Sequence, residues 1–243
     1  MKYWGITDPG CVRAQNQDAF QWEVLNKNTL LCVVCDGMGG AKSGNVASTL
    51  AVDVFVQEVK RTWKSDMSQD ELDQMLQGAV KLANFTVFDQ SKQFDEFSGM
   101  GTTLVAVLVH GKSATIVNVG DSRCYMVHSD GVKQLTTDHS VVQLMIQRGE
   151  LTPDQARSFP GKNLITRAIG TENVVTADVY HKKLESNDCL LLCTDGLSNM
   201  VDEQEILFEI VHGVNMESGC ERLLEIAKRR GAPDNVTCVL IQV

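Results

Sequence analysis

The sequence has few prolines, no long apolar run and a shortage of positive charge. Its 243 residues include 4 prolines and no linker-like stretch, so we expect one domain over residues 1–243. The longest apolar runs, 30–35 and 104–109, are far shorter than the roughly 18 residues of a membrane span. The net charge of −9 disfavours clustered phosphate contacts. We therefore expect no membrane and no nucleic acid among its partners.

The beginning of the chain also lacks the apolar segment of a signal peptide, and its 8 cysteines are scattered. We therefore expect a cytoplasmic protein with reduced thiols. Cys32 and Cys35 form a C-x-x-C pair inside the apolar run 30–35, which is typical of a buried strand. Side chains three residues apart on a strand point to opposite faces, so these two thiols should not share a metal.

Strands and helices are predicted in blocks rather than in strict alternation. Strands are predicted over 18–24, 30–35, 102–109, 114–119, 123–127, 132–135, 174–181, 190–194 and 236–243. Helices are predicted around 46–54, over 69–91, 141–148 and 206–211, and around 220–227. Runs of strands without crossover helices indicate antiparallel pairing. The sequence therefore predicts an α+β fold of two stacked antiparallel sheets with a helix pair on each outer face.

Four aspartates lie where predicted strands begin or end. Asp36 and Asp195 each follow a run of apolar residues and precede a glycine, Asp121 separates two strands, and Asp234 precedes the last strand. A single Asp-Gly pair is most often a turn. Carboxylates that converge repel one another, however, and a divalent cation with hard oxygen ligands relieves that repulsion. Taken together, the four aspartates predict a divalent-metal site.

Arg13 is a cationic candidate for the same site. It lies between the turn-forming residues 7–10 and the strand predicted over 18–24. An isolated arginine in a loop is usually a solvated surface residue, whereas its planar guanidinium can alternatively bind two oxygens of a phosphate. From the residues alone, both interpretations stay open.

Seven segments resemble the motifs of the metal-dependent protein phosphatase 2C family, in its bacterial branch, and occur in the family's order over essentially the whole chain. The segments are 13–18 (RAQNQD), 34–40 (VCDGMGG), 99–103 (GMGTT), 118–123 (NVGDSR), 135–140 (LTTDHS), 193–197 (CTDGL) and 233–237 (PDNVT). The resemblance implies a four-layer α-β-β-α sandwich. It also implies a protein serine/threonine phosphatase of phosphoserine and phosphothreonine that opposes a bacterial Ser/Thr kinase.

The resemblance further implies two bridged Mn²⁺ or Mg²⁺ ions and a weaker third ion. Asp36 would bridge the first two ions, and Asp195 and Asp234 would complete the ligands of the first. The Gly37 carbonyl would serve the second ion, and Asp121 would hold the third together with Asp195. A hydroxide shared by the bridged ions would attack the phosphorus directly, so no Cys or Ser nucleophile is expected.

Other residues would support these ligands. The resemblance implies that Arg13 clamps the substrate phosphate and that Asp18, Asn235, Gln17 and Asn199 surround the metal ligands. Many relatives have Glu in place of Gln17 and Asp in place of Asn199. Eukaryotic members often have a histidine two residues after the bridging aspartate, where this chain has Met38, so the general acid is left unassigned.

A mobile flap is expected over about 141–162, where Gly149 and the Pro160-Gly161 pair interrupt the chain. The preceding His139 is expected to have a structural or capping role rather than to act as the general acid. Two alternative functions are a non-catalytic sensor or scaffold of the same fold and a phosphatase of small phosphate esters. The expected partners are phosphorylated proteins, including a Ser/Thr kinase and its substrates, and the chain is expected to be a monomer.

Overall fold

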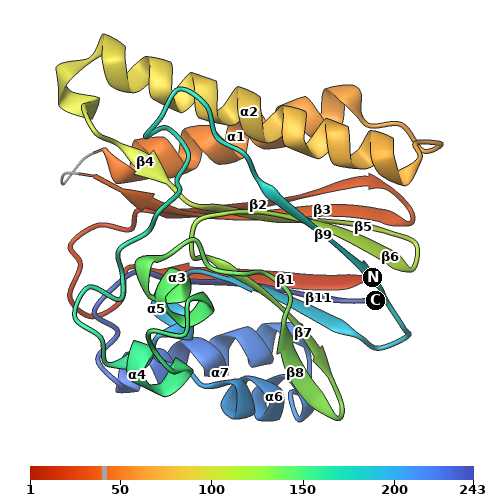
Figure 1. Ribbon diagram of the computed structural model, residues 1–243. Helices are drawn as coiled ribbons and strands as arrows, with labels where there is room; N and C mark the ends of the chain where they lie inside the picture. The colour runs from red at the N-terminus through yellow and green to blue at the C-terminus, as the bar shows by residue number, and fades with distance from the viewer. Residues whose placement is uncertain (40–42) are drawn as a thin grey trace.

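The computed structural model describes residues 1–39 and 43–243, whose strands form two sheets stacked face to face (Figure 1). In this part of the chain, the five-stranded sheet has the order β1 (Lys2–Asp8), β11 (Val236–Gln242), β10 (Cys189–Cys193), β7 (Arg123–His128) and β8 (Gly131–Gln134). The six-stranded sheet has the order β2 (Asp18–Asn26), β3 (Thr29–Met38), β5 (Leu104–His110), β6 (Ser113–Val119) and β9 (Asp178–Lys183), with β4 (Gly101–Thr102) paired to the end of β3. The paired strands are antiparallel throughout.

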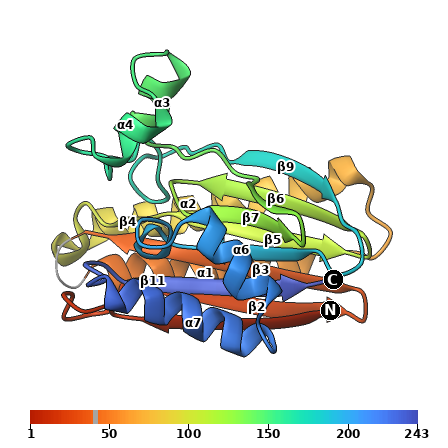
Figure 2. The same ribbon diagram turned by 90° about the horizontal axis from the view of Figure 1, so that it is seen from below.

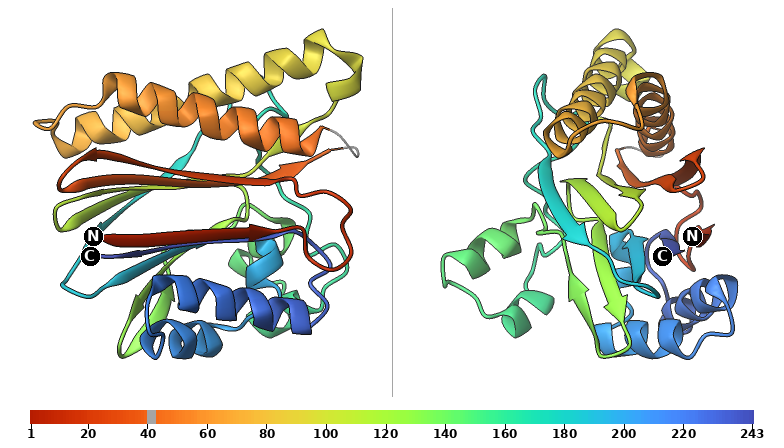
Figure 3. Two further views of the ribbon diagram at one scale, coloured as in Figure 1. Left: turned by 180° about the vertical axis from the view of Figure 1, so that it is seen from behind. Right: turned by 90° about the vertical axis from the view of Figure 1, so that its right-hand side faces the viewer.

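Helices cover the outer face of each sheet (Figures 1 and 3). The six-stranded sheet packs against α1 (Gly44–Thr62) and α2 (Gln69–Gln93), and the five-stranded sheet packs against α6 (Glu203–Val211) and α7 (Met216–Arg229). The predicted α-β-β-α sandwich of two antiparallel sheets is confirmed. No described helix combines the length and the apolar character that crossing a membrane requires.

Strand β3 shows how the alternation of side chains builds the layers. Cys32 lies in the apolar core between the two sheets, whereas Cys35 packs against α1 and α2 on the other face. Both thiols are fully buried and free. The expectation that Cys32 and Cys35 point to opposite faces is confirmed, as the two-residue period of a strand requires.

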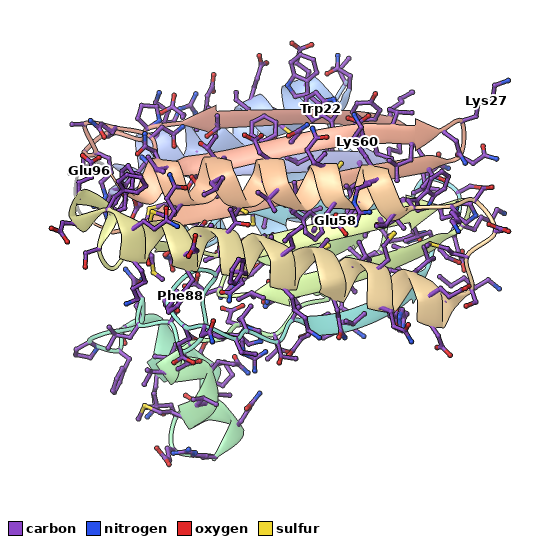
Figure 4. All side chains as sticks on the ribbon, turned by 90° about the horizontal axis from the view of Figure 1, so that it is seen from above. Trp22, Lys27, Glu58, Lys60, Phe88 and Glu96 are labelled. Atoms are coloured by element: carbon purple, nitrogen blue, oxygen red, sulfur yellow. The ribbon has the colours of Figure 1, made fainter. Side chains whose placement is uncertain are left out.

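Helices α1 and α2 begin and pack as their sequences indicate. Ser68 and Glu71 form a reciprocal capping box at the start of α2, which satisfies backbone N–H groups that lack helical partners. Figure 4 looks down on the two helices and shows Lys60 of α1 beside strand β2. Lys60 Nζ lies 3.0 Å from Glu23 Oε1 of that strand, so an ion pair joins the helix layer to the edge of the sheet.

Strand β1 is absent from the sequence-based prediction. It pairs with β11 over its whole length and is the edge of the five-stranded sheet. Gly5 interrupts its alternating pattern and hides the strand signal. The glycine is required because a Cβ there would lie 2.7 Å from a ring carbon of Phe20.

The strand predicted over 174–181 begins later, at Asp178. Its pairing with β6 begins at Asp178, opposite Asn118, one residue before β6 ends at Val119, and Gly120 then turns away with a φ of 105°. The carbonyl of Thr176 instead accepts a hydrogen bond of 2.9 Å from Arg167 Nη1. The predicted start at residue 174 was therefore wrong. The backbone at Thr176 pairs with the Arg167 side chain rather than with a neighbouring strand.

The segment expected to form a flap projects from the side of the sandwich (Figures 2 and 3). It contains α3 (Val141–Gln147), which was predicted, and the short α4 (Pro153–Arg157), which was not. Its two ends meet at its base, where the Val141 N–H donates to Leu164 O at 2.8 Å. That this segment moves stays a prediction. Gly40, the last residue of the segment 34–40, lies outside the described residues.

Candidate metal centre

Five aspartates gather at one end of the sandwich. Asp18 begins β2, Asp36 lies near the end of β3, Asp121 lies between β6 and β7, Asp195 begins α5 (Asp195–Ser198), and Asp234 precedes β11. Asp18 and Asp36 are direct partners in the β2–β3 register. Asp36 also lies within hydrogen-bonding reach of Asp195, and its charge interacts with those of Asp121 and Asp234. The structure therefore brings together acids that are far apart in the sequence.

Burial and crowding raise the pKa values of four of these aspartates. Burial, followed by the negative charges of Asp18 and Asp195, raises the pKa of Asp36 well above its ordinary value. Burial raises the pKa of Asp18 to about 7 although hydroxyl groups donate to it. Burial, together with the charge of Asp195, likewise raises the pKa of Asp121 to about 7. The pKa of Asp195 is raised by its burial and by the charge of Asp234. The folded centre therefore disfavours the ionised form of these carboxylates when no cation is bound.

The donor set fits a divalent cation. Among the described His, Cys, Asp and Glu side chains, no group of three is already arranged as a metal cage. The available donors are nevertheless carboxylate oxygens, which hard divalent ions prefer. Asp18 Oδ1 is buried without a hydrogen-bond partner, while its Oδ2 accepts from Thr237 Oγ1 at 2.6 Å and Thr194 Oγ1 at 2.9 Å. A cation or its water would satisfy that unpaired oxygen.

Gly37 brings three segments close together beside these acids. Its N–H donates to Gln17 O at 3.0 Å. A Cβ at this position would collide with the carbonyl oxygens of Gln17 and of Gly44 at the start of α1. The glycine after Asp36 is therefore required by this close backbone approach, rather than by a left-handed turn.

Asn235 fixes the loop that carries Arg13. The Asn235 side chain is buried, and its Nδ2 donates to Pro9 O and Gln15 O, each at 3.0 Å. Its Oδ1 accepts from the Gln17 N–H at 2.8 Å. One side chain therefore holds the loop at both ends. This placement is compatible with the supporting role that the resemblance implies for Asn235.

Arg13 is paired with Asp234. Its Nη2 lies 2.7 Å from Asp234 Oδ2, and Asp234 Oδ1 accepts from the Asn235 N–H at 2.9 Å. The hydrogen bond and charge of Asp234, with smaller contributions from Asp36 and Asp195, raise the pKa of Arg13. The Arg13 side chain keeps 55% of its surface exposed, so its guanidinium lies at the mouth of the centre. The sequence did not indicate this pairing.

The turn that carries Asp121 is held by His139. The His139 N–H donates to Gly120 O at 2.9 Å, and its Nδ1 accepts from the Gly120 N–H at 3.0 Å. A neutral Nδ1 is needed for that contact, and burial lowers the pKa of His139. His139 therefore anchors the turn, as its expected structural role implies. Asn199 lies beside the neighbouring acid, where its Nδ2 donates to Asp195 Oδ2 at 3.1 Å.

An open cleft of about 410 Å³ adjoins the centre. Asp121 and Asp195 form part of its wall, and the projecting segment contributes Gln143, Ile146 and Lys162. A second groove, of about 470 Å³, is lined by Met38 and by the segment 165–176. Asp121 and Asp195 therefore face open space into which a substrate can enter.

The resemblance noted in the sequence is confirmed by comparison with known proteins. The sequence model of the protein phosphatase 2C family matches residues 12–240, so the chain belongs to that family. The serine/threonine phosphatase stp of Listeria monocytogenes is 34% identical over 236 residues, which cover 97% of this chain and 93% of that protein. A crystal structure of the serine/threonine phosphatase of Staphylococcus aureus has a TM-score of 0.94 at 36% identity, covering 100% of this chain and 94% of that one.

A third similar structure bears on the metals. The catalytic domain of the serine/threonine phosphatase PstP, crystallised with two manganese ions, has a TM-score of 0.84 at 32% identity. The match covers 98% of this chain and 96% of that one. Family membership thus supports divalent-metal dependence, in agreement with the chemistry of the acidic donors described above.

The raised pKa values predict how the stability of the metal-free protein depends on pH. The unfolded chain releases protons from these acids at lower pH than the folded chain, so stability falls as pH rises from about 5.5 to 8. The lowered pKa of His139 acts in the opposite direction, but it is one group against four carboxylates. A tenfold change in proton affinity is worth about 1.4 kcal/mol, and 1 kcal/mol shifts the Tm by about 2–4 °C.

We therefore expect the Tm in EDTA to be several degrees higher at pH 5.5 than at pH 8. Calorimetric unfolding at both pH values measures the difference, and saturating Mn²⁺ should reduce or reverse it. Equal Tm values in EDTA at the two pH values would contradict the electrostatic strain inferred for the centre.

Proposed function

We propose that this protein hydrolyses phosphoserine and phosphothreonine residues of proteins, with Mn²⁺ or Mg²⁺ as its cofactor. The observation that carries the proposal is the convergence of five aspartates, with Arg13 at their mouth, in a chain of the protein phosphatase 2C family. A non-catalytic scaffold of the same fold would be expected to lose metal carboxylates, whereas Asp36, Asp195 and Asp234 are all present.

Asp36, Asp195, Asp234 and the Gly37 carbonyl would hold two ions, and Asp121 would hold a weaker third ion together with Asp195. When bound, such ions polarise a phosphoryl oxygen and make water acidic enough to react near neutral pH. The chain itself supplies the negative charge that binds them.

Arg13 and Asp18 have separate tasks in this proposal. The Arg13 guanidinium can turn from Asp234 toward a phosphate at the mouth of the centre and bind two of its oxygens. Asp18 Oδ1, unpaired and buried, can accept a proton from a water within the centre. The hydroxyls of Thr194 and Thr237 hold that carboxylate in place through its other oxygen.

The open cleft favours protein substrates over small phosphate esters. Its volume of about 410 Å³ is bounded on one side by the projecting segment, so an exposed loop of a partner has room to enter. We propose that the partners are phosphorylated proteins, among them a Ser/Thr kinase and its substrates. We further propose that the chain acts as a monomer, because the acids that form the centre all come from one chain.

Turnover on matched substrates tests this function. The purified protein with Mn²⁺ would be assayed on one peptide carrying phosphoserine, phosphothreonine or phosphotyrosine, and on small phosphate esters. We expect the highest kcat/KM on the phosphoserine and phosphothreonine peptides. Binding of the peptides without turnover would support the scaffold instead, and preferred turnover of a small ester would support a metabolite phosphatase.

Replacement of Arg13 tests its contact with phosphate. Arg13→Ala should lower kcat/KM on the phosphopeptide by about 10²-fold, because a charged donor to the phosphate is lost. Arg13→Lys should recover part of the loss, since an ammonium keeps the charge but not the two-pronged geometry. Steady-state kinetics and inhibition by inorganic phosphate measure both effects.

The matched control is Arg61→Ala, which removes another exposed arginine from an ion pair, with Glu58 of α1 (labelled in Figure 4). This variant should keep wild-type kinetics. If Arg13→Ala also kept its kcat/KM and its affinity for inorganic phosphate, Arg13 would have no part in substrate binding.

A further inference from the structure

The segment 99–103 has no assigned role in the function proposed above. It runs through β4 and ends at Thr103, the residue between β4 and β5. Thr103 is 3% exposed and lies between the two parts of the chain that carry Asp36 and Asp121. Its contacts with both parts suggest a task in the metal centre.

The first set of contacts fixes the backbone of Asp36. The Asp36 N–H donates to Thr103 Oγ1 at 2.9 Å, and the Thr103 N–H donates to Asp36 O at 2.9 Å. Thr102 Oγ1 donates to the same carbonyl at 2.9 Å. Thr102 and Thr103 therefore hold the N–H and the carbonyl group of Asp36. The carboxylate of Asp36 lies in the acidic centre.

The second set of contacts reaches the turn that carries Asp121. Thr103 Oγ1 lies 2.7 Å from the hydroxyl of Ser122, which is fully buried. A Cβ on Gly120 would lie 2.6 Å from Thr103 Cγ2, so the methyl group packs directly against the backbone of Gly120. Thr103 thus touches the residues on both sides of Asp121.

We propose that Thr103 is a positioning residue. Its single hydroxyl fixes Asp36 and Asp121 relative to each other, so that the two carboxylates keep a constant spacing for the ions that they would bind. The proposal rests on the metal-dependent function inferred above. Without the hydroxyl, the Asp36 N–H and the Ser122 hydroxyl would be left in a buried place without this partner. Removal of a group that orients a metal ligand without touching the metal typically lowers metal affinity by about 10–100-fold.

Substitutions at Thr103 separate the hydroxyl from the side-chain shape. Thr103→Val keeps the shape but removes the hydroxyl, and should weaken Mn²⁺ binding by about 10-fold or more. Thr103→Ser keeps the hydroxyl and should restore most of the affinity. Thr115→Val is the matched control, because Thr115 is a buried threonine of the same sheet whose hydroxyl accepts from Gln69 on α2. The control should lose stability without losing Mn²⁺ affinity.

Calorimetric titration of the purified, metal-free protein with Mn²⁺ measures these affinities independently of catalysis, with the Tm recorded for each variant. Ser122→Ala is a second variant in case Thr103→Val fails to fold. It leaves the contact between Thr103 and Asp36 in place and should weaken the weakest Mn²⁺ site alone. Thr103→Val or Ser122→Ala with wild-type affinities, or Thr103→Ser as weak as Thr103→Val, would overturn the proposal. A wild-type protein that bound no Mn²⁺ would instead refute the metal-dependent function.

Discussion

Asp36→Asn is expected to reduce phosphopeptide hydrolysis by roughly 10³-fold or more in the presence of Mn²⁺. Asp36 is the acid whose charge interacts with those of Asp18, Asp195, Asp121 and Asp234, so its carboxylate lies at the focus of the centre. The amide has nearly the same shape but no negative charge, and a cation held between these residues would lose its central ligand. Initial rates at saturating Mn²⁺ measure the effect.

The same substitution should stabilise the metal-free protein. The pKa of Asp36 is raised because its charged form is partly buried among like charges, so removal of that charge relieves repulsion. We expect a higher Tm for Asp36→Asn than for the wild type in EDTA at pH 8. With Mn²⁺ the order should reverse, because the variant gains little from the ion. Opposite changes in activity and stability are typical of a functional site.

Asp130→Asn is a suitable control for Asp36→Asn. Asp130 is an exposed acid in the turn between β7 and β8, and its carboxylate pairs with His128 Nδ1 at 2.7 Å. It lies at the opposite end of β7 from Asp121. The control should keep wild-type activity and metal response. If Asp36→Asn behaved like this control, Asp36 would not be a metal ligand.

The layers of the fold could be predicted because they follow from local patterns. The apolar runs at β3 and β5 and the amphipathic stripe of α2 indicated buried strands and a covering helix without any knowledge of their partners. The elements that were missed or misplaced depend on distant residues. Strand β1 is recognisable through its pairing with β11, at the other end of the chain, and the start of β9 is set by its pairing with Asn118 of β6.

Four of the five acids of the centre could also be identified from the sequence, because each lies next to a strand and strand ends can be located, whereas Asp18 was named only through the family resemblance. Asn199, which donates to Asp195, was named through the resemblance, but most of the contacts that hold the acids were not indicated. Asp36 is 67 residues from Thr103, and Arg13 is 221 residues from Asp234, so nothing local signals these contacts. His139 was assigned a structural role, but its contact with Gly120 requires the fold. Sequence patterns thus indicated the acids that the structure brings together, whereas the contacts that position them needed the structure.

Withdrawal of divalent cations is expected to abolish activity while leaving the protein folded. The two sheets and their helices have apolar cores of their own, which do not involve the acidic centre. A chelator should therefore remove turnover on phosphopeptides, and added Mn²⁺ or Mg²⁺ should restore it. Circular dichroism in EDTA should still show the mixed helix and strand content.

Binding of the cation should also raise the stability of the folded state by mass action. At a free Mn²⁺ concentration of about 100 times its Kd, the gain is about 2.7 kcal/mol. For a chain of this size that corresponds to a rise in Tm of about 5–10 °C. The rise should be larger at pH 8 than at pH 5.5. At pH 8 the carboxylates are ionised, so protons compete less with the cation for them. Turnover that persists after exhaustive chelation, or a Tm that ignores Mn²⁺ at pH 8, would exclude a metal-dependent centre formed by these aspartates.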